Sequence, residues 1–215
     1  MKIGIFGCGS VARTVGAGLA HAGHTVWLSS RDLESDNAKQ WQATGGTVAS
    51  FADVAGFADV LINALSGSAT LPILTALNAD TVSGKVLIDL ANPLDFSAGF
   101  PPTFTVTNTD SLGEQVQRAL PDVHVVKALN TVNTSVMVNP EIVLAGPTDL
   151  FICGNDPAAK QIVRALLLDL GWSNDSVRDV GDISASRGTE GYLALWVRLM
   201  NSFGTSTFNV RVVRQ

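Results

Sequence analysis

The sequence has little of what disulfide-bonded, zinc-binding or membrane-spanning proteins require. It contains two cysteines, Cys8 and Cys153, which lie far apart in no metal-binding or redox spacing. We therefore expect no disulfide framework and no metal site, and a reduced, cytoplasmic setting is the default expectation. No run reaches the roughly eighteen apolar residues of a membrane span, because Arg198 and Asn201 interrupt the nearest candidate at residues 191–203. We expect no membrane partner.

Charged residues are also scarce. They make up 15% of the chain, and 14 basic against 19 acidic side chains give a formal net charge of -5. Nucleic acids and anionic membrane surfaces attract basic proteins, so this balance argues against a nucleic-acid partner. The expected partner is a small molecule.

What the sequence does contain is a regular alternation of short apolar runs and helical patterns. Hydrophobic residues form 46% of the chain, which also has 20 glycines. Such alternation indicates β-α-β units and a parallel sheet. We predict an α/β fold of the Rossmann type, doubly wound around a mostly parallel sheet. The predicted strands are residues 2–6, 25–28, 47–49, 60–64, 86–90, 124–129, 150–153 and 177–180, and the predicted helices are residues 10–22, 36–44, 69–77, 111–120 and 157–170.

The pattern changes after Gly181. Residues 184–203 read as one helix whose apolar positions share a face, namely Leu193, Trp196, Leu199, Met200 and Phe203. We predict a Rossmann domain over residues 1–181 and a small C-terminal helical lobe over residues 182–215 packed on it. The apolar face is expected to pack on the sheet or on a second subunit, with a secondary role in shaping a substrate pocket. Residues 92–110 form the longest irregular stretch, and long loops are often functional.

A glycine-rich turn follows the first predicted strand. Gly7, Gly9 and Ala12 form a G-x-G-x-x-A motif that opens a helix, with Ser10 and Val11 between them. In such a turn the first glycine permits the bend, the second lets a pyrophosphate approach the backbone, and Ala12 keeps the helix close to the sheet. The N-terminus of the helix then offers free N–H groups to the phosphates. The motif predicts dinucleotide binding; a glycine-rich turn without a ligand is the alternative.

The end of the second strand indicates which dinucleotide binds. An acidic residue about twenty residues after the motif would receive the ribose hydroxyls of NAD. Here that place holds Ser29, Ser30 and Arg31. A guanidinium and two hydroxyls suit a dianionic 2'-phosphate, so NADP is favoured over NAD. Asp32 would lower the positive potential there unless it points away or caps the next helix.

Three later strands end in segments that also belong to the expected site. Ala64, Leu65 and Ser66 end the fourth strand, Asn92 and Pro93 end the fifth, and Asn130 and Thr131 end the next. The carboxyl edge of an open α/β sheet is where ligands bind, so we expect these residues to frame the nicotinamide. Turn chemistry is the alternative explanation for Asn92 and Asn130.

The usual catalytic side chains of dehydrogenases are missing. Tyr192 is the only tyrosine, and Trp196 stands four residues later, so a Tyr-x-x-x-Lys pair is absent. The three histidines, His21, His24 and His124, are expected to be structural. We assign no catalytic residue and no metal ligand. Hydride transfer to a flavin or deazaflavin can proceed by ring stacking alone, because the cofactors carry the chemistry.

Taken in order, the motifs resemble a known family. They are G-x-G-x-x-A, Ser29-Ser30-Arg31, the run from Asp89 to Leu94, the run from Val126 to Thr131, Cys153-Gly154-Asn155-Asp156, Asp179-Val180-Gly181 and the segment from Arg187 to Glu190. This combination resembles the NADPH-dependent F(420) reductase family nearly end to end. The resemblance implies a Rossmann domain with a C-terminal lobe, a homodimer, and hydride transfer between NADP(H) and a deazaflavin stacked on the nicotinamide. The cytosolic domains of membrane ferric reductases look similar and pass hydride to a flavin.

Two departures from the family pattern fall where the acceptor is expected. Ser66 and Gly67 stand where the family has a proline and an aromatic residue, and Asn130 replaces a histidine of the deazaflavin-using members. The main hypothesis is an NADP(H)-dependent oxidoreductase with coenzyme F(420) or a flavin as acceptor. A non-catalytic NADP(H) sensor and a reductase of small carbonyl compounds are the alternatives.

Overall fold

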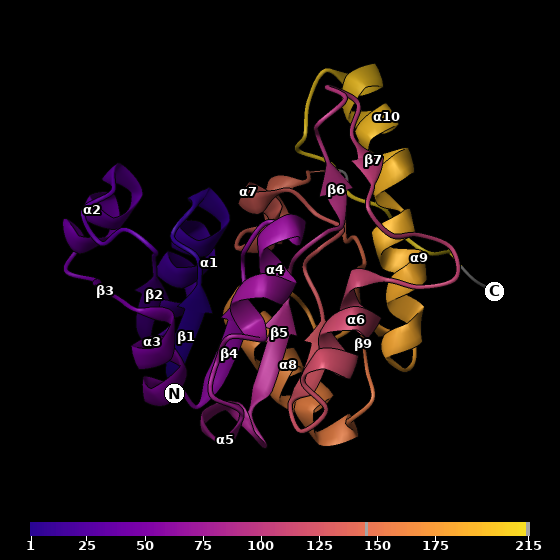
Figure 1. Ribbon diagram of the computed structural model, residues 1–215. Coiled ribbons are helices and arrows are strands. Elements are labelled where there is room, and N and C mark those ends of the chain that lie inside the picture. The colour runs from indigo at the N-terminus through magenta and orange to yellow at the C-terminus, as the bar shows by residue number, and fades with distance from the viewer. Residues whose placement is uncertain (145, 214–215) are drawn as a thin grey trace.

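The computed structural model describes residues 1–144 and 146–213, and it places one large sheet between two layers of helices (Figure 1). The sheet has the strand order β10-β9-β8-β5-β4-β1-β2-β3. All neighbours pair in parallel except β8 and β9, where Val126 faces Gly154 in an antiparallel register. The predicted Rossmann-type, mostly parallel sheet is therefore confirmed. The strands are β1 Lys2–Phe6, β2 Thr25–Ser29, β3 Thr47–Ala49, β4 Val60–Asn63, β5 Val86–Asp89, β8 His124–Lys127, β9 Leu150–Gly154 and β10 Val177–Asp179.

The helices cover both faces of the sheet. Helices α1 (Ser10–His21), α7 (Thr134–Met137) and α8 (Pro157–Asp169) lie on one face, and α3 (Phe51–Phe57), α4 (Gly67–Leu74), α5 (Ala79–Val82) and α6 (Leu112–Ala119) on the other. Each face of the sheet has its own hydrophobic core, and successive strand residues pack into opposite cores. Ile62 and Ile88 pack on the first face, while Leu61 and Leu87 pack on the second. This explains why the strands read as continuous apolar runs. Helix α2 (Asp36–Gln42) follows β2 at the edge of the sheet.

Local capping explains where several helices begin. Asp156 accepts a hydrogen bond from the backbone N–H of Ala159 at 2.6 Å, and Pro157 occupies the first position of α8. Ser50 caps α3 in the same way by accepting from Asp53. Helices α3, α5 and α7 are each seven residues or shorter and were not among the predicted elements.

The stretch expected to be irregular contains a small hairpin. Strands β6 (Leu94–Asp95) and β7 (Thr103–Phe104) pair antiparallel within residues 92–110. The hairpin lies beside the C-terminal helix α10 (Leu193–Phe203), where Leu94, Phe104, Leu193 and Val197 line a cavity of about 100 Å³ between them (Figure 1).

The C-terminal segment is not the single helix that the periodicity predicts. It comprises a 3-10 turn at Ile183–Ala185, helix α9 at Ser186–Gly191 and then α10. Helix α9 packs on α6, where Arg187 donates two hydrogen bonds to the Glu114 carboxylate at 2.8 and 2.6 Å. The domain division at residue 181 stays a prediction. In the described part of the chain, none of the helices is long and apolar enough to cross a membrane.

Candidate functional site

The glycine-rich turn has the geometry of a phosphate-binding loop. It connects β1 to α1, and Gly7 adopts a φ of 111°, which disfavours any residue with a side chain. The backbone N–H of Gly7 donates to Ser29 Oγ at 3.1 Å, which ties the loop to the end of β2. A Cβ atom added at Gly9 would meet nothing within 4 Å, so the space in front of the loop is open. Ala12 is fully buried beneath it.

A cavity of about 390 Å³ extends from this loop to the end of β2. Arg31 lines it, is exposed, and forms no hydrogen bond or ion pair with the residues that the structure describes. Ser30 donates its hydroxyl hydrogen to the backbone oxygen of Asp32 at 2.7 Å. Ser29 is fully buried beneath the loop. Its hydroxyl supports the loop, and the expected binding of a 2'-phosphate by Ser29, Ser30 and Arg31 stays a prediction.

Two charged side chains, those of Asp32 and Arg13, hold segments that line this cavity. Asp32 accepts a hydrogen bond from the backbone N–H of Glu34 at 2.9 Å, so its carboxylate stabilises the turn before α2. Arg13 was missed by sequence reasoning: its guanidinium donates to the backbone oxygen of Cys8 at 2.6 Å and to Asn37 Oδ1. The position of Arg13, one helical turn after Gly9, could have indicated this contact, because a side chain there points back toward the loop.

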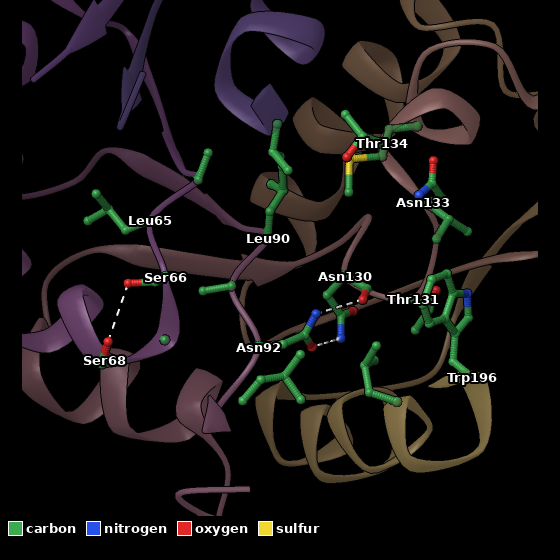
Figure 2. Close-up of a pocket in the computed structure, with 18 of the residues that line it drawn as sticks. Leu65, Ser66, Ser68, Leu90, Asn92, Asn130, Thr131, Asn133, Thr134 and Trp196 are labelled. Carbon is green, nitrogen blue, oxygen red and sulfur yellow. Dashed lines mark hydrogen bonds between the residues drawn. The ribbon is translucent and has the colours of Figure 1, made fainter. Parts of the chain in front are cut away.

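A second cavity, of about 540 Å³, lies at the carboxyl ends of β4, β5 and β8 (Figure 2). It adjoins the first, because Ala64, Leu65 and Ser66 line both. Leu193 and Trp196 of α10 complete its wall, so the C-terminal helix does shape this pocket. The polar residues that line it are Ser66, Ser68, Asn92, Asp95, Thr105, Asn130, Thr131, Asn133 and Thr134.

Two asparagines form a closed pair at the floor of this pocket (Figure 2). Asn92 Nδ2 donates to the backbone oxygen of Asn130 at 2.8 Å, and Asn130 Nδ2 donates to Asn92 Oδ1 at 3.0 Å. Asn130 Oδ1, Thr131 Oγ1 and Trp196 Nε1 are buried and have no hydrogen-bond partner among the described residues. Buried polar atoms in native proteins are almost always paired, so these three atoms are exceptions in the wall of the pocket.

The backbone is strained beside this pair. Leu129 is 2% exposed and has a φ of 60°, a left-handed conformation that a branched side chain rarely adopts. It stands between β8 and Asn130, so it turns the chain sharply as the strand ends. Strain of this kind costs about 1–3 kcal/mol and persists mainly at functional sites.

Comparison with known proteins places these features in a family. Residues 2–93 match the family model described as NADP oxidoreductase, coenzyme F(420)-dependent. The chain is 30% identical to the F(420)-dependent NADP reductase of Methanocaldococcus jannaschii over an alignment of 165 residues, which covers 74% of this chain and 70% of that protein. The chain belongs to the F(420)-dependent NADP oxidoreductase family.

Two further relatives are similar over nearly the whole chain. A crystal structure from Arthrobacter sp. FB24, of a protein provisionally assigned as an F(420)-dependent NADP reductase, is 44% identical with a TM-score of 0.93 and full coverage of both chains. Metalloreductase STEAP3 of Rattus norvegicus is 26% identical over 216 residues. The alignment covers 96% of this chain but 38% of that protein, so the chain corresponds to only part of it.

Within this family member, twelve of the fifteen residues proposed for cofactor binding line one of the two adjoining cavities. The three others, Ser10, Ala12 and Pro93, do not line them. The structure explains why residue 67 is a glycine: a Cβ atom there would lie 2.3 Å from the backbone oxygen of Asn92. Helix α4 therefore begins directly against the asparagine pair.

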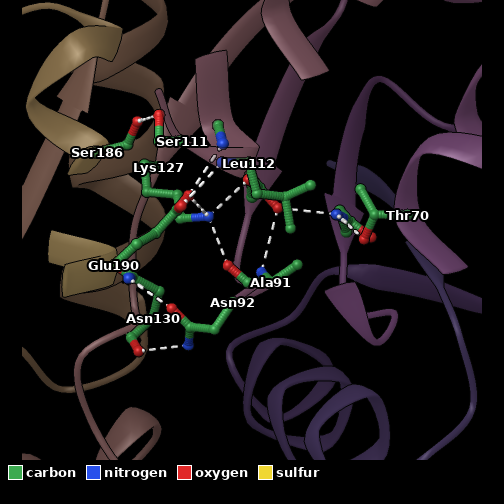
Figure 3. A network of polar contacts seen from close by, with 12 residues as sticks. Thr70, Ala91, Asn92, Ser111, Leu112, Lys127, Asn130, Ser186 and Glu190 are labelled. Carbon is green, nitrogen blue, oxygen red and sulfur yellow. Dashed lines mark hydrogen bonds and ion pairs between the residues drawn. The ribbon is translucent and has the colours of Figure 1, made fainter. Parts of the chain in front are cut away.

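A buried charge network behind the pocket was not expected from sequence (Figure 3). Lys127 Nζ lies 2.9 Å from Asp89 Oδ2 and 2.7 Å from Glu190 Oε1, and the three side chains are at most 3% exposed. Lys127 also donates to the backbone oxygen of Ala91, directly before Asn92. Glu190 accepts the backbone N–H groups of Leu112 and Gly113 at 2.8 and 2.9 Å, in the first turn of α6.

Burial and the neighbouring charges together shift the pKa values of Lys127 and Cys153. Burial alone would lower the pKa of Lys127, but the charges of Asp89 and Glu190 outweigh burial and raise that pKa above its ordinary value. Lys127 is therefore a buried cation held by two carboxylates. Burial raises the pKa of the nearby Cys153 thiol to about 12.

Proposed function

We propose that this protein transfers hydride between NADP(H) and a flavin-type or deazaflavin-type acceptor such as coenzyme F(420). The observation that carries the proposal is the junction of the two cavities at Ala64, Leu65 and Ser66. A dinucleotide lying across the carboxyl edge would run from Arg31 over the glycine-rich loop into the pocket beneath α10.

The described residues fit a bound NADP(H). The space in front of Gly9 is open, and α1 begins there without a side-chain cap on its first N–H groups. Gly7, Gly9, Ser10 and Val11 would hold the pyrophosphate. Ser30 and Arg31 would bind the 2'-phosphate, since a guanidinium binds such a group in a bidentate manner.

The larger pocket would bring nicotinamide and acceptor together. Bound NADPH supplies the hydride. The protein's own contribution is orientation and exclusion of water by Leu65, Leu90 and Trp196, which line the pocket. Among the described residues that line it, Asp95 carries the one titratable side chain. Two hydrogen bonds from Ser97 lower the pKa of Asp95; the bond from the backbone N–H has the larger effect and the bond from the side chain the smaller. Asp95 therefore remains a carboxylate and donates no proton. This chemistry suits an acceptor that needs orientation and no protein acid.

NADPH oxidation by the purified protein tests the proposal directly. The nicotinamide absorbance is followed with deazaflavin, FMN, FAD, riboflavin and ferric chelates offered in parallel. Turnover with deazaflavin or with flavins supports the proposal and identifies the acceptor class. Tight NADPH binding without turnover of any of these would instead favour a sensor, and turnover of small carbonyl compounds alone would favour a carbonyl reductase.

A further inference from the structure

The segment that follows α10 folds back onto that helix. Gly204, with a φ of 65°, ends α10, and residues 205–213 (the strap) turn back from that end of the helix (Figure 1). In the strap, the Phe208 ring stacks on the indole of Trp196, with ring centroids 5.3 Å apart and an angle of 23° between the planes. Phe203 contacts the Phe208 ring edge-on, with centroids 5.5 Å apart. Phe208 is therefore in contact with two aromatic side chains of α10.

The strap is also fastened to the segment that begins β9. The Asn209 side chain donates to the backbone oxygen of Asp149 at 3.0 Å. Asp149 donates its own backbone N–H to the backbone oxygen of Val210 at 2.9 Å, and its carboxylate accepts the N–H of Val212 at 2.6 Å. Asp149 is 3% exposed, so these bonds are shielded from water. Phe208 directly precedes this anchored stretch, so its position is fixed from the side of β9 as well as by α10.

Trp196 depends on this support because no hydrogen bond holds its ring. Its Nε1 is buried and has no hydrogen-bond partner among the described residues, so packing such as the stack on Phe208 must orient the indole. Trp196 also forms part of the pocket wall, on the opposite side from Leu65 and Ser66, where the two cavities adjoin (Figure 2). A dinucleotide that enters past Leu65 would leave the side of Trp196 to the second ring.

We propose that Phe208 is a positioning residue for the hydride acceptor, because it holds the Trp196 indole against the part of the pocket that the acceptor ring occupies. This inference rests on the proposed function. Phe208 is not among the described residues that line the pocket, so it acts through Trp196. Loss of its ring should weaken binding of the acceptor and leave NADPH binding unchanged.

The kinetic test uses Phe208→Leu, which removes the ring and keeps an apolar side chain. With NADPH saturating, KM for coenzyme F(420) or riboflavin, whichever is turned over, should rise about two- to twelvefold, the factor that one aromatic pair supplies. The value of kcat and the dissociation constant of NADPH should change less than about twofold, as expected when only acceptor binding is lost. Phe208→Tyr keeps the ring and should restore the low KM. Asn209→Ala, which loosens the strap, should raise KM.

Fluorine spectra test the position of the indole without any ligand. The chain has four tryptophans, so 5-fluorotryptophan introduces four resonances, and the one that Trp196→Phe removes is the one to follow. It should move in Phe208→Leu. The matched control is Phe57→Leu, which removes a stack of the same two residue types, on Trp27, with centroids 4.0 Å apart. Phe57 lines neither cavity, so this variant should move the Trp27 resonance and keep the wild-type KM.

Three results would overturn the inference. They are an unmoved Trp196 resonance in Phe208→Leu, a moved resonance with the wild-type acceptor KM, and an equal rise of KM in Phe57→Leu. If Phe208→Leu does not fold, Asn209→Ala decides by the same two readouts. If neither coenzyme F(420) nor any flavin is turned over, the proposed function fails, and the fluorine spectra still decide whether Phe208 positions Trp196.

Discussion

Arg31 is the single residue that we propose selects the nucleotide. It is exposed at the end of β2 and makes no ion pair with the described residues, so its charge is available to a 2'-phosphate. Arg31→Ala should weaken NADPH binding relative to NADH binding by about 1.5–3 kcal/mol, the value of hydrogen bonds to charged groups. Dissociation constants from the change in nicotinamide fluorescence measure both.

Lys39→Ala is the control for this substitution, since it removes the same charge from the following helix α2. Lys39 lies 3.5 Å from Glu34, and the two side chains are 59% and 83% exposed. Its loss should change the two nucleotides equally and slightly. An equal loss of NADPH and NADH affinity in Arg31→Ala would show that the 2'-phosphate binds elsewhere, with Arg13 as the next cation to examine.

Residues of the loop could be predicted from sequence because local geometry fixes them. Gly7 needs a left-handed backbone, and the motif places Arg31 at the end of the next strand. The hydrogen bond from the Gly7 N–H to Ser29 could not be predicted, because a serine at a strand end gives no sign of which backbone group it contacts. The unpaired oxygen of Asn130 also depends on Asn92, which comes from another strand.

At the scale of elements, Lys127 joins β8 to β5 and to α9, and through Glu190 to the N-terminus of α6. Lys127→Met leaves two carboxylates buried without their cation, and removing one partner of a buried ion pair costs about 3–5 kcal/mol. Urea unfolding should show a loss of this size. The raised pKa means that the contribution of Lys127 is fully present below its unfolded pKa of about 10.4 and is lost as the pH rises through the higher folded value.

Lys160→Met provides the comparison for the network. Lys160 pairs with Asp179 at 2.8 Å, but the Asp179 side chain is 41% exposed. Its removal should cost less than about 1 kcal/mol. If Lys127→Met lowered the free energy of unfolding no more than Lys160→Met does, the network would contribute little to stability.

The sequence predicts elements whose signal is local and misses those set by distant partners. The strands that form the large sheet were expected within one or two residues at their ends, because each is a short apolar run whose length and flanking turn residues mark a buried strand. The hairpin β6–β7 has only two residues in each strand, so it leaves no periodicity to detect. The network of Lys127, Asp89 and Glu190 joins segments far apart in the chain, so the spacing of these residues in the sequence does not predict it.

At the scale of the whole molecule, the net charge of -5 and the carboxylate of Asp95 in the pocket should repel anionic acceptors. With NADPH saturating, kcat/KM for FMN should rise about two- to threefold as salt shortens the screening length from about 30 to 10 Å. Riboflavin, which is uncharged, should show little change. A fall in the FMN rate with salt would indicate attraction by a cation, and Arg198, which lines the neighbouring small cavity, is the residue to replace. The homodimer stays a prediction at this scale.

The two cysteines differ in exposure, so one of them can be labelled selectively to report on ligand binding. Cys153 is fully buried with a pKa raised to about 12, so it stays protonated and resists alkylation. Cys8 is partly exposed and lines the cavity of the glycine-rich loop. A maleimide dye or an isotope-coded tag would therefore label a single position in the unmodified chain, and dinucleotide bound over the loop would shield it. Occupancy could then be followed by mass spectrometry without introducing any new thiol.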